Sequence, residues 1–187
     1  MGGMVSLWGA SSLIRSRQQG NTSIGAGSST VDTTITAIDM ANTILVHEGW
    51  YHNITNGARP RDSWVRIKLL NSTTVRVIQD TAGSGVDGVV YWTVLQFAPG
   101  VIRQIQRNSV TIGSGTGTGT TGISEIDLAK SLLIYNGWTY TGTEAYSSTD
   151  PKNWLVFMYA SSSTVVTAAR PGTGNSVNLE FEMVEFF

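Results

Sequence analysis

The sequence predicts an all-β protein built from two tandem antiparallel β-sandwich or barrel-like repeats. Residues 35–50 and residues 123–138 are near-copies that lie eighty-eight positions apart, with seven of sixteen positions identical. Each half of the chain also contains about six short stretches of alternating or β-branched residues, separated by turn residues, as small β-sandwiches do. No stretch has the spacing of a long amphipathic helix. We therefore expect one β module that is used twice.

The repeats divide the chain into four segments. Residues 1–13 are an N-terminal arm without a counterpart, residues 14–97 the first repeat, residues 98–101 a linker and residues 102–187 the second repeat. The linker contains Ala98-Pro99-Gly100, whose residue types stop a strand. Because the linker is short, we expect the two repeats to pack against each other.

The first strands of each repeat are expected in β-branched or apolar runs. The run at residues 109–112 precedes a glycine- and threonine-rich stretch, residues 113–122, which we interpret as a loop. Two compact apolar runs, residues 43–47 and 131–135, are interpreted as strands that end at a Gly-Trp pair. Alternating runs that also predict strands are residues 33–38 and 123–126.

A β-hairpin follows in each repeat. Trp64, Arg66 and Lys68 alternate with apolar residues, as in a half-buried strand. The second repeat has Val156 and Met158 in place of the two charged residues. We expect that face of the second repeat to be covered by the other repeat or by another subunit, which makes Val156 and Met158 candidate inter-subunit contacts. The hairpin strands are expected at residues 64–70, 74–78, 154–159 and 164–168.

Each repeat closes with a strand, at residues 89–97 and 177–186. The alternation of apolar and polar residues slips by one position near Leu95 in the first copy and near Val184 in the second. A change of phase at the same point in both copies predicts a β-bulge or a strand that changes neighbours.

Composition favours assembly and argues against several classes of partner. Charged residues make up 13% of the 187 residues, about half the usual share, so serine, threonine, asparagine and glycine supply most of the polar surface. Such a surface suits permanent assembly. The net charge of −1 lacks the basic footprint of nucleic-acid binding. We expect no membrane span, because no apolar run approaches about 20 residues, and no signal peptide in residues 1–13.

The residues that could carry chemistry do not form a convincing site. The glycine-rich stretch that begins at Gly113 lacks the following helix that phosphate binding requires. His47, Glu48 and His52 suggest a metal, but their spacing is not that of a helical zinc pair, and the second repeat has other residue types there.

Asp39 and Asp127 occupy one position of the repeat. A pair of carboxylates could serve a glycosidase. Two copies in like surroundings instead favour a structural role, in which each aspartate accepts backbone N–H bonds in a turn. We therefore predict a protein that is not an enzyme, with no catalytic residue, no metal and no cofactor.

Four aromatic residues are candidates for stacking on a glycan or a partner: Trp50, Tyr51, Trp138 and Tyr140. Aromatic rings at strand ends can bind sugars, but they also fill cores or anchor subunits.

The arm contains apolar residues, of which Leu7, Trp8 and Leu13 are candidate inter-subunit contacts. It is either a frayed terminus or an extended segment that lies on a neighbouring subunit. The second alternative would cover the tryptophan, whose exposure is costly on a soluble monomer.

Several short motifs resemble modules of tailed-bacteriophage virion proteins. These are Ile105-Gln106-Arg107, the Ser-Val-Thr-Ile run at 109–112, the turn at 162–170 and the Met-Val-Glu-Phe run at 183–186. The resemblance covers most of residues 102–187 and, more weakly, residues 14–97, where Arg17-Gln18-Gln19 replaces the first motif. It implies a structural role in a phage particle.

We therefore expect a non-enzymatic virion component, either a capsid decoration (cement) protein or a tail-associated one, that bridges virion proteins and itself as a homo-oligomer. The alternative is a receptor- or glycan-binding module on the exterior of the virion, associated with a tail fibre or baseplate.

Overall fold

The computed structural model describes residues 13–25, 27–53, 64–79, 87–141 and 155–187. Within these ranges the chain is all-β, as the sequence predicts, with antiparallel strands and short 3-10 turns. The elements of residues 14–97, the first half, are β1 (Ile14–Ile24), β2 (Thr30–Thr34), η1 (Met40–Asn42), β3 (Thr43–Asn53), β4 (Arg66–Asn71), β5 (Thr74–Ile78) and β6 (Asp87–Phe97).

The elements of residues 102–187, the second half, follow in the same order and with the same lengths. They are β7 (Ile102–Ile112), β8 (Thr118–Gly122), η3 (Leu128–Lys130), β9 (Ser131–Thr141), β10 (Phe157–Ser162), β11 (Val165–Ala169) and β12 (Ser176–Phe186). The pairing registers also match, since Thr43 lies opposite Gln96 and Ser131 opposite Glu185. Residues of the two halves can therefore be compared position by position.

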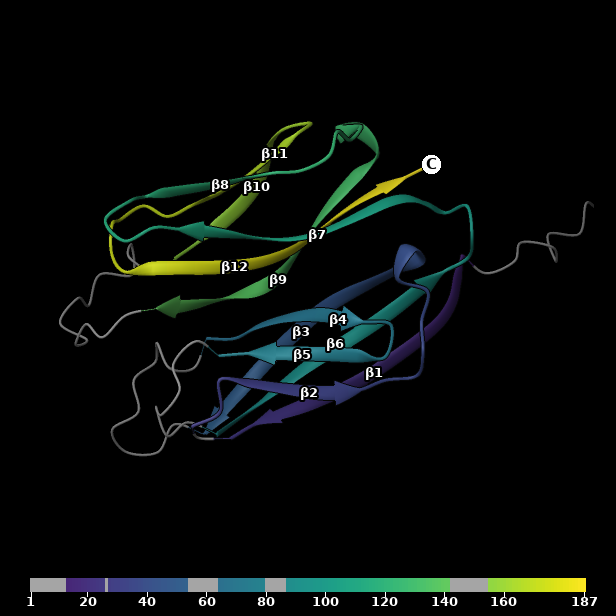
Figure 1. Cartoon of the computed structure of the whole chain (residues 1–187), viewed down its shortest axis with the longest axis horizontal. Coiled ribbons are helices and arrows are strands. Elements are labelled where there is room, and N and C mark those ends of the chain that lie inside the picture. Colours follow the sequence, from purple (N-terminus) through teal and green to yellow (C-terminus); the bar gives the residue numbers. More distant parts are fainter. Residues whose placement is uncertain (1–12, 26, 54–63, 80–86, 142–154) are drawn as a thin grey trace, which may run out of the picture.

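Each half is a sandwich of two three-stranded layers (Figure 1). In the first half β1, β6 and β3 lie behind β2, β5 and β4, and apolar residues of both layers form the core between them, including Leu45, Ile67 and Val90. In the second half β7, β12 and β9 face β8, β11 and β10 around a second core that contains Phe181. A single bridge between Arg66 and Gly137 joins β4 to β9, which makes one sheet of six strands across the halves.

The 3-10 turns are capped as the sequence predicts. Asp39 accepts a hydrogen bond from the backbone N–H of Ala41, and Asp127 accepts one from Ala129, both at 3.0 Å. Residues 35–38 and 123–126 are not strands, which corrects the expectation for residues 123–126 and for all of residues 33–38 but the first two, which end β2. Ile35, for example, donates its N–H to the carbonyl of Thr73 in the hairpin turn, so these residues cross between layers.

Two more expectations are wrong at the level of strand limits. The Gly-Trp pairs do not end strands, because β3 and β9 continue through them after one extra residue, with Gly49 at φ 140° and Gly137 at φ 91°. Residues 118–122 of the expected loop form β8, where a side chain on Gly119 would lie 2.1 Å from the carbonyl oxygen of Thr111 on β7.

A bulge in the closing strands does not cause the change in their apolar–polar alternation. The extra residues lie in the partner strands β1, β3, β7 and β9. Val184 instead belongs to a third apolar cluster with Ile44 and Ile102, which lies between the two halves. The strand β12 is therefore buried on both faces, and polar residues are not needed at alternate positions.

The second hairpin is one residue out of phase with the expectation. Phe157 lies opposite Ala169 as Arg66 lies opposite Ile78, so Phe157 takes the place of Arg66. Val156 and Met158 are half-buried against the core of the second half, and they are not the outward residues of this strand. The outward positions belong to Leu155, Phe157 and Tyr159, all exposed.

Candidate functional site

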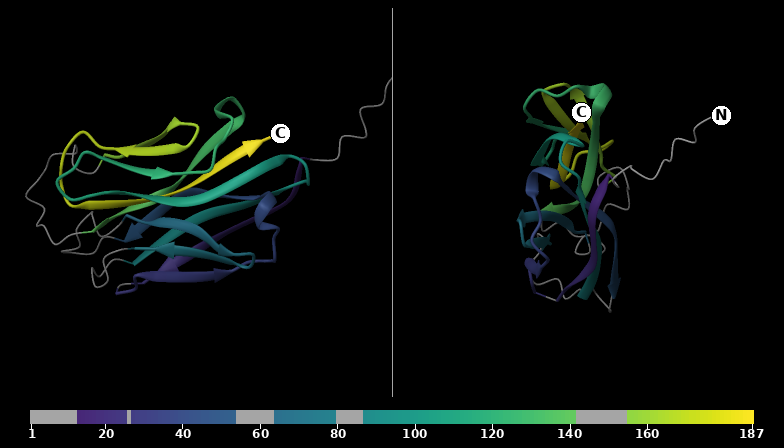
Figure 2. Two further views of the ribbon diagram at one scale, coloured as in Figure 1. Left: turned by 45° about the horizontal axis from the view of Figure 1, so that its top comes forward. Right: turned by 90° about the vertical axis from the view of Figure 1, so that its right-hand side faces the viewer.

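The two halves meet at a joint where the second half covers the free edge of β3 and β4. Figure 2 shows the second half lying alongside the first, and β9 and β12 contact both edge strands. At the centre of the joint, Gly137 lets the chain before β4 approach closely. A Cβ atom at Gly137 would lie 2.3 Å from the carbonyl oxygen of Val65.

Glu182 is the main polar contact of the joint. Its carboxylate accepts a hydrogen bond from the N–H of Leu45 at 2.9 Å and pairs with Arg107 at 2.8 Å. Arg107 also donates to the carbonyls of Met40 and Thr43. Burial raises the pKa of Glu182, while the charge of Arg107 and the two hydrogen bonds oppose that rise. The carboxylate thus supplies the partner that the edge strand β3 lacks.

Two further glutamates of β12 are buried in ion pairs. Glu180 pairs with Arg66 at 2.8 Å and lies 3.9 Å from the ammonium group of Lys68. Glu185 pairs with Arg103 at 2.9 Å and accepts a hydrogen bond from Gln104, which together hold the pKa of its carboxyl below its usual range, the Gln104 bond most strongly.

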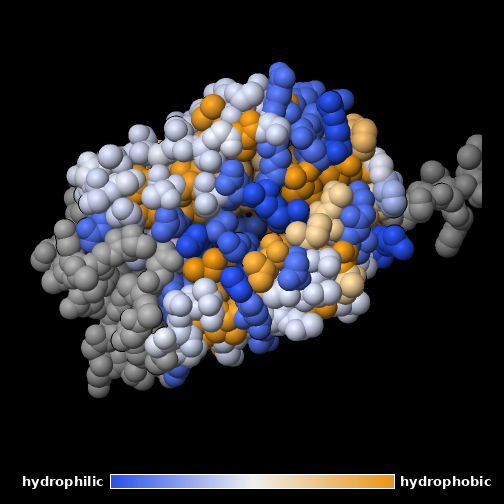
Figure 3. Space-filling model, in the orientation of Figure 1, coloured by the Kyte–Doolittle hydropathy of each residue, from blue (hydrophilic) through white to orange (hydrophobic). Residues whose placement is uncertain are grey.

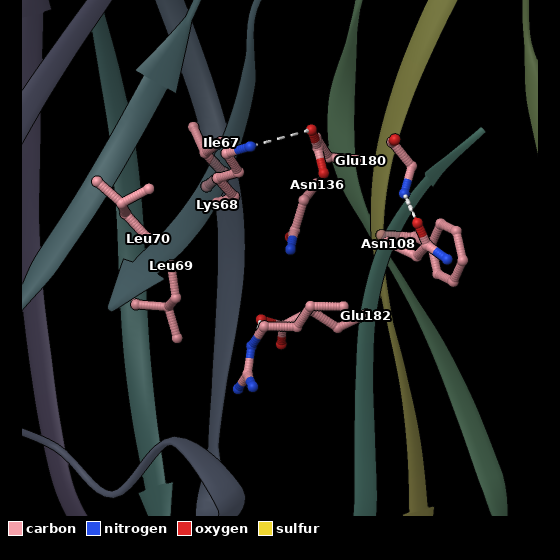
Figure 4. A pocket seen from close by; sticks show the side chains of 11 residues that line it. Ile67, Lys68, Leu69, Leu70, Asn108, Asn136, Glu180 and Glu182 are labelled. Atoms are coloured by element: carbon pink, nitrogen blue, oxygen red, sulfur yellow. Dashed lines mark hydrogen bonds and ion pairs between the residues drawn. The ribbon is translucent and has the colours of Figure 1, made fainter. Parts of the chain in front are cut away.

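A polar cleft of about 290 Å³ lies between the halves beside these pairs. Figure 3 shows hydrophilic residues around a hollow at this boundary, and Figure 4 shows Asn136 pointing into the cleft from β9. The Asn136 side chain is buried, and its Oδ1 has no hydrogen-bond partner. Glu180 and Glu182 both line the cleft, and each forms an ion pair with an arginine. The two carboxylates therefore stabilise the contact between the halves and are not placed to act as an acid and a base.

Tryptophans from both halves stack at one end of the joint. Trp64 lies between Trp138, at 4.3 Å between ring centroids, and Trp50, at 5.2 Å. Trp138 is only 7% exposed and packs in the core of the second half, so it is not available to stack on a ligand, contrary to one expectation. Tyr140 is half-buried, and its hydroxyl accepts a hydrogen bond from the N–H of Asn175. Trp50 and Tyr51 remain 38% and 62% exposed.

The histidine cluster does not form a metal centre in the described part of the chain, where no group of three His, Cys, Asp or Glu could hold an ion. His47 stacks on Trp50 at 5.7 Å between ring centroids, and burial lowers its pKa to about 4. Glu48 accepts hydrogen bonds from Thr93 and Gln19. The side chain of His52 lies outside the described residues.

The glycine-rich stretch directs carbonyl groups, and not N–H groups, at its charged neighbour. The buried guanidinium of Arg170 donates to the carbonyls of Gly113, Thr116 and Gly174. The carbonyls thus satisfy the guanidinium within the chain, and the stretch does not present the row of N–H groups that binds a phosphate.

The second half has an edge, formed by β9 and β10, that corresponds to the covered edge of the first half. The chain bridges this edge to β4 at Gly137, and other side chains along the edge are exposed. We call it the second-half edge and define it by its exposed apolar residues. These are Leu132, Tyr135, Leu155, Phe157 and Tyr159. The side chains of Tyr135, Phe157 and Tyr159 border a groove of about 390 Å³ between β9 and β10. This is the candidate functional site.

The other candidate contacts are placed only in part. Leu7 and Trp8 lie outside the described residues. Leu13 is exposed, and its carbonyl accepts a hydrogen bond from the N–H of Ala98. Sequence reasoning missed the buried glutamates because charged residues that alternate along a strand are typical of a solvated face. The one available signal was the absence of that alternation at Val184.

Comparisons of the chain with protein-family models, with curated proteins and with solved structures gave no match. No helix in the described ranges is long and apolar enough to cross a membrane.

Proposed function

We propose that the protein is a non-enzymatic structural component of a tailed-phage virion, which binds capsid or tail proteins and copies of itself through its β modules. The observation that carries this proposal is the second-half edge. It exposes five large apolar or aromatic side chains on β9, on β10 and just before β10, whereas protein covers the same edge of the first half. Large apolar side chains that are exposed together along one edge mark interaction sites.

The virion assignment rests on the resemblance of the sequence motifs. Two of these motifs occupy the joint, since Ile105 belongs to the apolar cluster between the halves and Arg107 pairs with Glu182. The Met183–Phe186 motif supplies Val184 to the same cluster. The motifs therefore support the idea of a module that is built to pack against another module.

The test is whether the protein is part of the particle. Virions purified from a phage that encodes this chain are labelled with a specific antibody and gold, and their proteins are identified by mass spectrometry. We expect regular labelling of the capsid or the tail. Purified particles without the protein would overturn the proposal.

A second candidate function is glycan binding, which the exposure of Trp50 and Tyr51 favours. A glycan array with the wild-type chain and with Tyr51→Ala tests it. Binding that the Tyr51→Ala variant loses would support a glycan-binding module. An array without signal would remove this candidate.

A further inference from the structure

We propose that the second-half edge binds the first-half face of a second copy of this chain. The first-half face is the outward surface of β1, β6 and β3 around Gln19, Gly49 and Tyr91. The contact would repeat, between two chains, the part of the joint around Gly137 that helps to hold the halves together within one chain. This inference rests on the proposed assembly function and names the partner as the chain itself.

The exposed fractions of side chains at matching positions of the two halves differ as a repeated contact requires. On the edge side, Ile44 of the joint is 6% exposed, whereas Leu132 at the same position of the second half is 50% exposed. On the face side, Glu180 of the joint is 8% exposed, whereas Tyr91 at the same position of the first half is 45% exposed. At these two positions, a side chain that is covered in one half has an exposed counterpart in the other half.

The open surfaces differ from the joint by substitutions that match across the contact. Arg66 on the edge and Glu180 on the face form an ion pair in the joint. Phe157 replaces Arg66 on the second-half edge, and Tyr91 replaces Glu180 on the first-half face. The two residues that form an ion pair in the joint therefore correspond to two aromatic residues on the open surfaces. Aromatic pairs are well suited to interfaces between subunits.

The third observation is the space above Gly49. In the joint, Gly137 accommodates the backbone of Val65 and Arg66. Gly49 has the same place in the first half and lies next to Tyr91, but no atom comes within 4 Å of the position that its Cβ would occupy. The approach path that β4 uses in the joint is therefore open for Val156 and Phe157 of another chain.

The geometry defines the polarity of the assembly. Leu95 and Phe97, at one end of the first-half face, already contact the second half of their own chain, so the second copy binds at the other end, near Tyr91. An edge that binds a face makes a head-to-tail contact, which forms open series or rings and not only symmetric dimers.

The experiment uses the full chain and measures mass by sedimentation velocity over a range of concentrations. The variants are Phe157→Arg on the edge, Tyr91→Glu on the face and the double variant, which recreates the ion pair of the joint. Thr120→Arg is the control, since it adds the same charge at an exposed position of β8, outside both surfaces. Circular dichroism confirms that each variant is folded.

We expect the wild type and the control to form a concentration-dependent series of oligomers, and each single variant to lose association by at least about tenfold in Kd. An equimolar mixture of the single variants should form the series again, with the two variants alternating, because the edge of each variant matches the face of the other. The double variant should form the series again.

Three results would overturn the inference: a wild type that stays monomeric, a Phe157→Arg variant that associates normally, or single variants that do not combine with each other. None of these results depends on phage particles. If virions are labelled but the single variants do not associate with each other, only this inference is removed. If the single variants do associate but the protein is absent from virions, only the proposed virion role is removed.

Discussion

At the scale of single residues, the half-buried His47 makes stability depend on pH. Its pKa of about 4 lies below the usual 6.5 because burial disfavours the charged ring. Between these values the unfolded chain binds a proton at this site that the folded chain does not, so His47 lowers the free energy of unfolding as pH falls from about 6.5 to 4. Above pH 6.5 this contribution is constant.

The prediction is that His47→Phe unfolds with a smaller dependence on pH than the wild type across this window. Urea denaturation at several pH values between 4 and 7.5 measures it. Equal slopes for the two proteins would show that His47 is protonated in the folded chain as readily as in the unfolded one.

Glu182 is the second residue whose role can be tested alone. Glu182→Gln keeps the shape of the side chain but removes the charge that Arg107 faces, and Arg107 then lies in the joint without its ion-pair partner. We expect a loss of about 3–5 kcal/mol in the free energy of unfolding, the usual cost of breaking a buried ion pair.

Glu125→Gln is the matched control, because Glu125 is exposed and the same charge is removed. Chemical denaturation of both variants decides the matter. A Glu182→Gln variant as stable as the control would mean that solvent reaches the carboxylate.

The sequence could predict some residues of this protein and not others. The roles of Asp39 and Asp127 were predictable because a cap is a local interaction, made within two residues of the chain. The role of Glu182 was not predictable, because its partner Leu45 is 137 positions away and nothing local marks that contact. Almost all contacts of the joint are of this type, between residues that are far apart in the sequence.

At the scale of elements, Gly137 and Gly49 offer a matched comparison. Both have positive φ, so alanine is strained at either position, at a cost of about 1–3 kcal/mol. At Gly137 the new methyl group would also collide with the carbonyl of Val65, whereas at Gly49 it meets nothing within 4 Å.

We therefore expect Gly137→Ala to destabilise the chain clearly more than Gly49→Ala, because β4 must move away from β9 only in the first variant. The difference between their free energies of unfolding, measured by denaturation, gives the cost of the collision with β4 apart from the backbone strain. Equal losses would mean that backbone strain accounts for both.

Elements were predictable where the pattern within one strand identified them. Both hairpins and both closing strands lie within a few residues of their expected positions, because their alternation reflects one buried face. The strand β8 was not predictable, because the glycines that suggested a loop serve a close approach to β7 instead. The phase of β10 escaped prediction since the alignment that placed Val156 at the position of Arg66 is one residue away from the register of the strand pairing.

At the scale of the whole molecule, the apolar cluster between the halves should couple their unfolding. Val184 is fully buried there, with contributions from Ile44 of the first half and Ile102 of the second. We expect a single calorimetric transition for the wild type, because neither half can unfold without exposing this cluster.

Val184→Asp should divide the transition into two, since a charge in the cluster separates the halves without entering either sandwich core. Leu132→Asp is the control, because Leu132 lies opposite Val184 on β9 and is exposed. Two transitions in the wild type would show that the halves unfold independently.

The position of β12 has a consequence for how the protein is made. This strand leaves the ribosome after the other eleven described strands, and it carries both Glu182 and Val184. A nascent chain has therefore completed every strand of its first half, and β9 as well, long before β12 can complete the cover over the edge of β3 and β4. During that interval the edge is exposed to neighbouring nascent chains, which is the situation in which β proteins mispair. The time between the synthesis of residue 97 and that of residue 184 thus becomes a quantity that translation speed and chaperones can control.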